Sequence, residues 1–286
     1  MLVEECLRTR DGVPSGQHIL EYGEDDLSIA LAHAVWLQTI LGHPHSARAY
    51  AARLREHAEG LNHPFVRMSG RALLALSGLV GRDLRAAFNE AEAALALGHE
   101  HSLAPLMMAS LVLHRGWVLA LQGQADGMLP AMRQALAGIE AAGVRLWYAF
   151  SRLQLGEARL CAERLDEASR LVEAATAVAS ELGLGGWMCE CLRLGSEVLL
   201  ERERAAGSVG SPQAEAAFLE AIALARQQRA RLLELRATTN LVRFASTGGP
   251  RGARGARAGR AVRLVQRRIR PRRSRAGEAG PGQGST

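Results

Sequence analysis

The sequence repeats itself at intervals of about 40 residues, and this periodicity restricts the chain to few folds. A small or apolar anchor residue recurs at positions 47, 86, 128, 168 and 214, with separations of 39, 42, 40 and 46 residues. A unit of this length accommodates two antiparallel helices joined by a tight turn. Such a unit cannot bury its apolar face alone, so the repeat predicts a row of stacked helix pairs.

Small residues recur at matching places in each unit and predict where the helices touch. A glycine at the end of a unit's first helix can adopt the left-handed conformation that ends the helix. An alanine early in the second helix lets two backbones approach, and a small residue seven positions later lies on the same face. A glycine in the middle of a first helix costs about 1 kcal/mol relative to alanine, so close packing is the expected reason for it. The predicted packing positions are Gly42, Ala47, Gly81, Ala86, Gly116, Gly123, Ala135, Gly156, Ala168, Ala175, Gly195, Ala214, Phe218 and Ala221.

The composition agrees with an all-α chain. Alanine, leucine, arginine and glutamate, which favour helix, dominate the sequence, and strand-rich runs are absent. The first helices of the units are predicted near 25–41, 64–80, 102–122, 146–162 and 186–203. The second helices are predicted near 45–59, 83–97, 125–142, 165–182 and 212–227, and a sixth first helix near 230–246. The segment 205–212 is predicted to be a loop, which accounts for the longest of the four intervals.

The mid-helix glycine and the two alanines seven residues apart resemble the signature positions of tetratricopeptide repeats, although the usual period is about 34 residues. The resemblance implies an all-α, tetratricopeptide-like αα-hairpin solenoid of about five and a half helix pairs. Residues 24–247 are expected to form this repeat domain. Residues 1–23 are expected to be the remnant of a preceding repeat or an extension, and residues 248–286 a disordered tail rich in arginine and glycine.

Three strings resemble a more specific group, the C-terminal repeat region of large bacterial predicted ATPases, many of which carry a class III adenylate-cyclase-like domain. These strings are LHRGWVLALQGQADGMLPAMRQAL, GWMCECLRLGSEVLL and PQAEAAFLEAIALARQQRARLLELRATTNLVRF. The resemblance covers about residues 20–248 and implies a regulatory arm that senses a protein or small effector and restrains an NTPase. The chain contains no lysine and therefore no G-x-x-x-x-G-K-[ST] phosphate loop, so the family's catalytic activities are not carried over. We expect a non-catalytic module without a cofactor, which acts on a separate NTPase or cyclase chain.

The candidate ligand site is the concave groove lined by the first helices. Trp36 and Trp117 lie one residue after the position of the mid-helix small residue, on the face that lines this groove in the repeat type. Aromatic rings there can hold a peptide or a small ligand. The alternative, which we favour for Trp36, Trp117, Trp147 and Trp187, is packing between repeats. The predicted groove contacts are Trp36, Leu113, Trp117, Leu153, Glu157, Leu192 and Ser196.

Other polar groups receive structural interpretations. Glu190, Arg193 and Glu197 share a helix face and are predicted to form an exposed salt-bridge ladder rather than a catalytic acid–base pair. The histidines in two turns are predicted to be solvated and not to bind metal; they are His43, His45, His99 and His101. The four cysteines have neither disulfide nor zinc spacing and are predicted to be buried or half-buried; they are Cys6, Cys161, Cys189 and Cys191.

The positive charge is concentrated in the tail. Residues 249–286 hold 11 of the 35 basic residues and one acid, Glu278, whereas residues 1–248 hold 24 basic and 28 acidic residues. Such a tail suggests an alternative function in binding nucleic acid or another polyanion, although it lacks aromatic rings for base stacking. The sequence has no apolar run of membrane-spanning length and no signal peptide at its start, so a cytoplasmic location is expected.

The end of the chain carries two further predictions. The helix near 230–246 has an apolar face and no following partner helix, which predicts fraying and self-association; the face comprises Leu232, Leu233, Leu235, Leu241 and Val242. The family resemblance stops after FASTGG. Back-translation of Val262 to Pro271 with suitable codons, read one base later, gives YGWFSEGFD, which resembles the family's continuation. Residues from about 249 onward are therefore predicted to be a frameshifted translation without a functional element.

Overall fold

The computed structural model describes residues 25–207 and 212–247, and within this part the chain is helical with no strand. The helices are α3 (Asp26–Ile40), α4 (Pro44–Gly60), α5 (Pro64–Gly81), α6 (Leu84–Glu100), α7 (Pro105–Leu121), α8 (Ala125–Ala141), α9 (Arg145–Cys161), α10 (Leu165–Glu181), α11 (Gly185–Ala205), α12 (Pro212–Gln227) and α13 (Arg231–Thr247). Each predicted helix is confirmed. The largest differences are three residues: α6 ends at Glu100 rather than near residue 97, and α7 begins at Pro105 rather than near residue 102.

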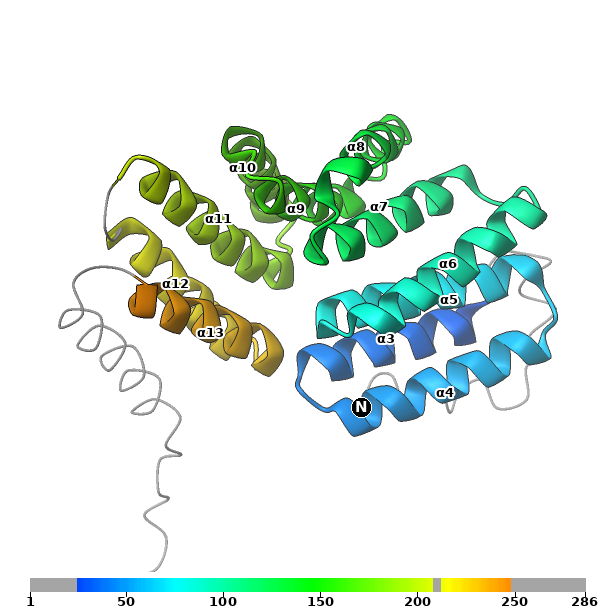
Figure 1. Cartoon of the computed structure of the whole chain (residues 1–286). Helices are drawn as coiled ribbons and strands as arrows, with labels where there is room; N and C mark the ends of the chain where they lie inside the picture. The colour runs from blue at the N-terminus through cyan, green and yellow to red at the C-terminus, as the bar shows by residue number, and fades with distance from the viewer. Residues whose placement is uncertain (1–24, 208–211, 248–286) are drawn as a thin grey trace, which may run out of the picture.

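The helices form an αα-hairpin solenoid that curves around a central axis (Figure 1). Each odd-numbered helix contacts the next odd-numbered helix, so α3, α5, α7, α9, α11 and α13 make a continuous inner layer. The even-numbered helices pack against their neighbours in the chain and form the outer layer. The predicted all-α, tetratricopeptide-like solenoid is thus the fold of the described residues.

Local sequence signals explain where helices begin and end. Proline stands at the start of α4, α5 and α7, where its missing N–H costs no hydrogen bond. The Asp83 carboxylate caps α6 by accepting from the Ala86 N–H at 3.1 Å. Gly123 takes the predicted left-handed conformation at the end of α7, with φ +87°. Gly81, by contrast, stays inside α5, and Arg82 adopts the left-handed conformation instead, with φ +59°.

Nine of the fourteen predicted packing positions are buried, and two of the anchor positions are shifted by one residue. Most of the predicted alanines in the second helices are buried, as is Phe218. In the second repeat the buried residue is Ala87 rather than Ala86, and Ala87 is the residue that lies against Gly78 of α5. In the third repeat Leu129 is buried in place of the anchor at position 128. Gly116 is required as predicted, since a Cβ there would lie 2.5 Å from Met132 Cγ.

The first and last described helices meet, so the solenoid closes on itself. Helix α13 contacts α3, and Ile40 of α3 packs against a cluster that includes Cys189 of α11 and Leu233 of α13. The prediction of an uncovered apolar face on the last helix is therefore wrong for Leu233 and Leu241, which are 3% and 2% exposed. Leu235 remains 63% exposed. Self-association through this helix stays a prediction.

Several predictions lie outside the described residues. These are the N-terminal remnant at 1–23, Cys6, and the arginine-rich tail at 248–286 with its frameshift. Among the described helices, none is both long enough and apolar enough to cross a membrane.

Candidate functional site

Four aromatic rings from four inner helices meet at the centre of the solenoid. Trp187 of α11 stacks on Phe150 of α9 with ring centroids 4.3 Å apart, and Trp36 of α3 lies 5.7 Å from Trp187. Trp117 of α7 meets Phe150 edge-to-face at 5.8 Å. This aromatic cluster and its surroundings leave about 20 Å³ of free space, room for roughly one water molecule. Trp36, Trp117 and Trp187 therefore pack between helices of different repeats, as the packing interpretation predicted.

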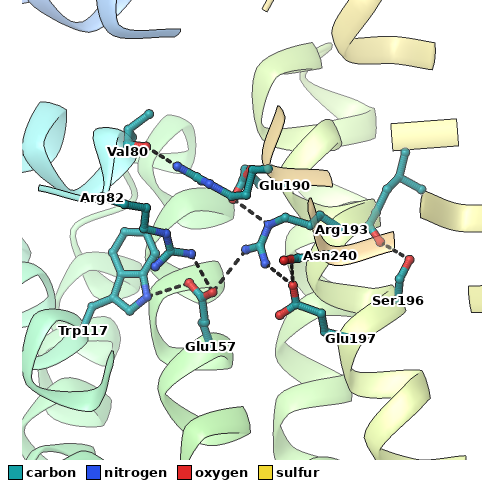
Figure 2. Close-up of polar contacts among 11 residues, drawn as sticks. Val80, Arg82, Trp117, Glu157, Glu190, Arg193, Ser196, Glu197 and Asn240 are labelled. Atoms are coloured by element: carbon teal, nitrogen blue, oxygen red, sulfur yellow. Dashed lines mark hydrogen bonds and ion pairs between the residues drawn. The ribbon is translucent and has the colours of Figure 1, made fainter. Parts of the chain in front are cut away.

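Glu157 of α9 lies beside the aromatic cluster and accepts hydrogen bonds from three side chains (Figure 2). The Trp117 indole Nε1 donates to Glu157 Oε2 at 2.7 Å. Arg82 Nη2 donates to Glu157 Oε1 at 2.7 Å, and Arg193 Nη2 donates to the same oxygen at 3.3 Å. The Arg82 guanidinium also lies 5.1 Å from the centre of the Trp117 ring, within cation–π range.

Arg193 of α11 is the centre of this charged group. Its Nε donates to Glu190 Oε2 at 3.1 Å, and its Nη1 donates to Glu197 Oε1 at 2.7 Å. The three residues share a helix face as predicted, but the prediction of an exposed ladder is wrong, because the Arg193 side chain is 3% exposed. Residues of α9 and α13 contact this face and remove it from water.

Helix α13 completes the network from the other end of the chain. Arg236 Nη1 donates to Glu190 Oε2 at 2.8 Å, and its Nη2 donates to the backbone carbonyl of Val80 at the end of α5. Asn240 donates its side-chain amide to Glu197 Oε1. We call the six charged residues the central ion network; they are Arg82, Glu157, Glu190, Arg193, Glu197 and Arg236 (Figure 2).

The network sets the protonation of its carboxylates. Burial acts to raise the pKa of Glu190, but the positive charges around it, Arg193 foremost, outweigh burial and lower its pKa to about 2. The pKa of Glu157 is lowered in the same way, against burial, by Arg193 and Arg82. The pKa of Glu197 is raised, because burial there outweighs the attraction of Arg193. Two of the three carboxylates are thus held ionised.

An open groove of about 630 Å³ lies over one side of the central ion network. We call it the arginine groove; its lining includes Arg82, Leu84, Leu121, Glu157, Arg193, Glu197, Leu232, Leu235, Arg236, Thr239, Asn240 and Arg243. A second groove of about 920 Å³ shares Glu197, Asn240 and Arg243 with it and continues over α9, α11 and α12. The inner side of the solenoid therefore combines a closed aromatic cluster with an accessible charged surface.

The predicted groove contacts divide into two sets. Trp36 and Trp117 belong to the aromatic cluster, and Leu153 and Glu157 line the same small cavity, on the inner side as predicted. The prediction is wrong for Leu113 and Ser196, which are buried, and it stays a prediction for the half-buried Leu192. Leu113 is fully buried in the core, and the buried Ser196 hydroxyl donates to the Leu192 carbonyl of its own helix. The Leu192 side chain packs against the cluster of α12 and α13.

Sequence reasoning missed the other members of the site, Arg82, Phe150, Arg236 and Asn240, and gave Glu190, Arg193 and Glu197 an exposed role. One signal was available: charged residues recur on inner helices next to small residues that predict close packing, as in Gly156–Glu157. A charge at a closely packed position is expected to find a buried partner.

The remaining candidate residues are the turn histidines and the cysteines. The four turn histidines are exposed, and the described residues contain no group of three or more metal-binding side chains. Cys189 and Cys191 are buried as predicted, whereas the prediction is wrong for Cys161, which is exposed. Burial raises the pKa of the thiol to about 11 for Cys191 and about 12 for Cys189. The pKa of Cys161 is raised to about 11, because neighbouring residues partly desolvate its thiol and Glu157 adds negative charge. These three thiols therefore stay protonated at neutral pH.

The comparisons with known proteins found matches among solved structures alone. No protein-family model matches this chain, and no curated protein matches it. A solved structure that is similar is the crystal structure of a Signal Transduction ATPase with Numerous Domains (STAND) protein with a tetratricopeptide repeat sensor from Pyrococcus horikoshii. The sequence identity is 17% and the TM-score 0.48, over 85% of this chain and 36% of that chain. The present chain thus spans little more than a third of that protein's length.

Proposed function

We propose that this chain is a non-catalytic binding module that takes a protein segment or a small effector on the inner side of its solenoid. The observation that carries the proposal is the arginine groove, an opening of about 630 Å³ at the place where the inner helices converge. Repeat solenoids bind partners on their concave surfaces. A groove of this size also suits a small organic ligand.

The chemistry of the described residues favours binding over turnover. General acid–base catalysis works best with a pKa near the operating pH, whereas Glu157 and Glu190 are held ionised by arginines. The pKa of Glu197 is raised, but this carboxylate already accepts from Arg193 and Asn240. The thiols of Cys161, Cys189 and Cys191 are protonated and so are poor nucleophiles.

The energetics of the central ion network support the same proposal. Burying an ion pair takes both charges out of water, and well-packed apolar residues in its place are often as stable or more stable. Three arginines and three glutamates at the centre of the fold are therefore a poor device for stability alone. Charged side chains that line an open groove can instead recognise a polar or charged partner by electrostatic complementarity.

The finer part of the proposal is regulatory. The resemblance of the repeat strings to bacterial predicted ATPases supports a role as the sensor arm of a signalling ATPase or adenylate cyclase on a separate chain. Sequencing the DNA upstream of the gene tests this role. A neighbouring frame that encodes a phosphate loop supports it, and an unrelated frame on the opposite strand counts against it.

The binding proposal is tested with the purified full chain. A thermal-shift screen against a library of metabolites and peptides is followed by hydrogen exchange of each bound complex. We expect at least one ligand that raises Tm and slows exchange in the inner helices α9, α11 and α13, with no hydrolysis of ATP or GTP. Nucleotide turnover that a substitution in the central ion network abolishes, or protection confined to the outer helices, contradicts the proposal.

A second candidate function, polyanion binding through the tail, is favoured by the 11 basic residues and single acid in residues 249–286. Binding of this kind weakens steeply with salt, because each phosphate contact releases counterions. Deletion of residues 249–286 is then expected to abolish binding of a duplex DNA probe. Salt-insensitive binding, or binding retained after the deletion, excludes this function.

A further inference from the structure

The two ends of the solenoid face each other where α13 meets α3 and α5 (Figure 1). We call this junction the seam; it comprises Trp36, Ile40 and Val80 of α3 and α5, and Trp187, Leu233 and Arg236 of α11 and α13. Neighbouring inner helices are joined through a single outer helix, whereas α3 and α13 are joined only through the whole solenoid. The seam therefore has no hairpin connection to hold it together.

The mechanics of a solenoid concentrate movement at the seam. Each repeat is rotated slightly relative to its neighbour, and these rotations add along the chain of repeats. A small change of angle at every junction therefore produces its largest displacement between the two ends. Such a movement can separate α13 from α3 without disrupting the packing between neighbouring repeats.

The aromatic rings pack less closely across the seam than beside it. Within the inner layer, Trp187 stacks on Phe150 with ring centroids 4.3 Å apart. Across the seam, the centroids of Trp36 and Trp187 are 5.7 Å apart. Phe150 is buried, whereas Trp36 and Ile40 are half-buried. The N-terminal side of the seam thus keeps part of its apolar surface in contact with water.

The seam also closes over an imperfectly filled space. The free volume of about 20 Å³ beside the aromatic cluster is lined from both sides of the seam. The buried Trp36 Nε1 has no acceptor in the protein, whereas Trp117 Nε1 donates to Glu157 at 2.7 Å. An unfilled space forfeits dispersion contacts, and a buried donor without a protein acceptor gains water when it is exposed. Both features lower the free energy needed to open the seam.

Opening the seam leaves the adjacent ion pair intact. Arg236 donates to the Val80 carbonyl across the seam, and this hydrogen bond is lost when the seam opens. The same guanidinium pairs with Glu190 at 2.8 Å, and both residues lie on the C-terminal side, so this ion pair moves as a unit. Separation of the ends therefore strands no buried charge, which would be the most costly consequence of a movement here.

We propose that the solenoid opens and closes at the seam, and that the open state gives a partner access to Trp36 and Trp187. Closed, the seam buries Leu233 and Cys189 against Ile40 and shuts off the aromatic cluster. Open, it presents an aromatic and aliphatic surface on the inner side of the solenoid. Such opening is a property of the chain alone and does not depend on which ligand the module binds.

A reversible disulfide across the seam tests the opening in the full chain. A Cβ on Gly42 would lie 3.1 Å from Arg231 Cβ, and disulfides place their Cβ atoms about 3.5–4.5 Å apart, so Gly42→Cys with Arg231→Cys needs only a small shift. Cysteine at residue 42 is strained by the φ of +79°, but equally in the oxidised and reduced forms that are compared. Peptide mapping verifies the bond between residues 42 and 231.

The measurement is hydrogen exchange of the indole N–H groups in chain labelled with ¹⁵N-tryptophan, assigned with single Trp→Phe variants. Trp36 reports on the seam, and Trp117, bonded to Glu157, is the reference for unfolding of the whole domain. We expect Trp36 to exchange faster than Trp117 in the parent chain. Oxidation is expected to slow Trp36 by about tenfold relative to Trp117, because it blocks a local opening.

Ile40→Ala tests the same opening without a disulfide. Removing this side chain takes apolar contacts from the seam alone and is expected to speed Trp36 exchange about fivefold, with Trp117 unchanged. Leu37→Ala is the matched control, since Leu37 lies on the same helix and is 42% exposed. It is expected to leave the Trp36 rate unchanged.

The proposal is overturned if Trp36 and Trp117 exchange at one rate in the parent chain, if oxidation slows both equally, or if Ile40→Ala and Leu37→Ala give the same Trp36 rate. These failures are distinguishable from failure of the proposed function. Equal Trp36 rates together with a ligand from the metabolite and peptide screen would remove the opening and keep the binding module. A Trp36 rate that responds to the disulfide, with no ligand found, would do the reverse.

Discussion

Arg236 on α13 donates a hydrogen bond to the backbone carbonyl of Val80 on α5, across 156 positions of sequence. The same guanidinium pairs with Glu190 of α11 at 2.8 Å. In a typical repeat solenoid each unit contacts only its neighbours, and stability is close to a sum of local terms. Here the last described helix is bonded to the second helix pair and also contacts α3 of the first pair, so the two ends of the solenoid are energetically linked.

Arg236→Met is the variant that tests this link. Methionine retains most of the apolar stem but leaves the Val80 carbonyl unpaired and Glu190 with Arg193 alone. Removing one partner of a buried ion pair costs roughly 3–5 kcal/mol, and the 10% exposure of Arg236 places the expected loss near about 3 kcal/mol. Urea unfolding measures it. Hydrogen exchange is expected to become faster in α13 and in α3, the helix that α13 contacts.

The control for Arg236→Met is Arg85→Met, which changes an exposed arginine on the outer helix α6. Its effect on the free energy of unfolding is expected to stay within about 0.5 kcal/mol. Equal effects of the two variants, or unchanged exchange in α3, would mean that the two ends of the solenoid are not linked.

Glu157→Gln tests the charge at the centre of the site. The amide has nearly the shape of the carboxylate but removes the negative charge that faces Arg82 and Arg193. We expect a loss of about 3 kcal/mol in the free energy of unfolding, because two buried or half-buried guanidinium groups lose a counter-ion. Tryptophan fluorescence should change as well, since Trp117 donates to this carboxylate.

A matched variant for Glu157→Gln is Glu140→Gln. Glu140 pairs with Arg152 at 2.7 Å, but its side chain is 37% exposed. Exposed pairs contribute about 0–1 kcal/mol, so this variant is expected to be nearly neutral. Similar losses for Glu157→Gln and Glu140→Gln would show that the central ion network is screened by water after all.

The helices were predictable from the sequence, whereas most of the candidate site was not, and the reason is geometric. Helix ends depend on local signals such as Pro44, Asp83 and Gly123, which act within a few residues. The curvature of a solenoid instead accumulates from a small rotation at every repeat. No single repeat reveals that Arg236 comes to lie beside Val80.

The misjudged salt-bridge ladder illustrates the same limit. The spacing of Glu190, Arg193 and Glu197 correctly placed the three side chains on one face of α11. The spacing did not show whether that face is exposed to solvent or buried against other helices, because residues at helical spacing share a face in both cases. The arrival of Arg236 from α13 decides the question.

Gly78→Ala is predicted to destabilise the second repeat. A Cβ at this position would lie 3.0 Å from the Ala87 backbone nitrogen and 3.1 Å from its Cβ, so α5 and α6 must move apart. Overpacking of this kind typically costs about 1–3 kcal/mol.

Gly138→Ala in α8 is the opposite case, because nothing lies within 4 Å of the added Cβ. There the better helix propensity of alanine is expected to stabilise by up to about 1 kcal/mol. Thermal unfolding of both variants checks the prediction, which fails if the two shifts have the same sign.

Because His114 is buried, we expect the protein to lose stability in mildly acidic solution. This histidine of α7 is buried among the inner helices, and burial lowers its pKa from 6.5 to about 4. Below pH 6.5 the unfolded chain binds a proton at His114 that the folded chain does not take up until about pH 4. The free energy of unfolding therefore falls as the pH decreases through this window. The expected loss between pH 7 and pH 5 is about 2 kcal/mol.

The His114 effect is separable from that of Glu190 in the central ion network. Glu190 has a folded pKa of about 2, below its ordinary 4.5, so its contribution is lost only as the pH falls from about 4.5 through 2. Urea unfolding of His114→Gln between pH 7 and pH 5 should show a much smaller slope than the parent chain, because the amide does not titrate. His45→Gln, which changes an exposed histidine on α4, should retain the parent slope. If His114→Gln keeps the parent slope, the acid sensitivity comes from another group and the buried neutral state of His114 is not its cause.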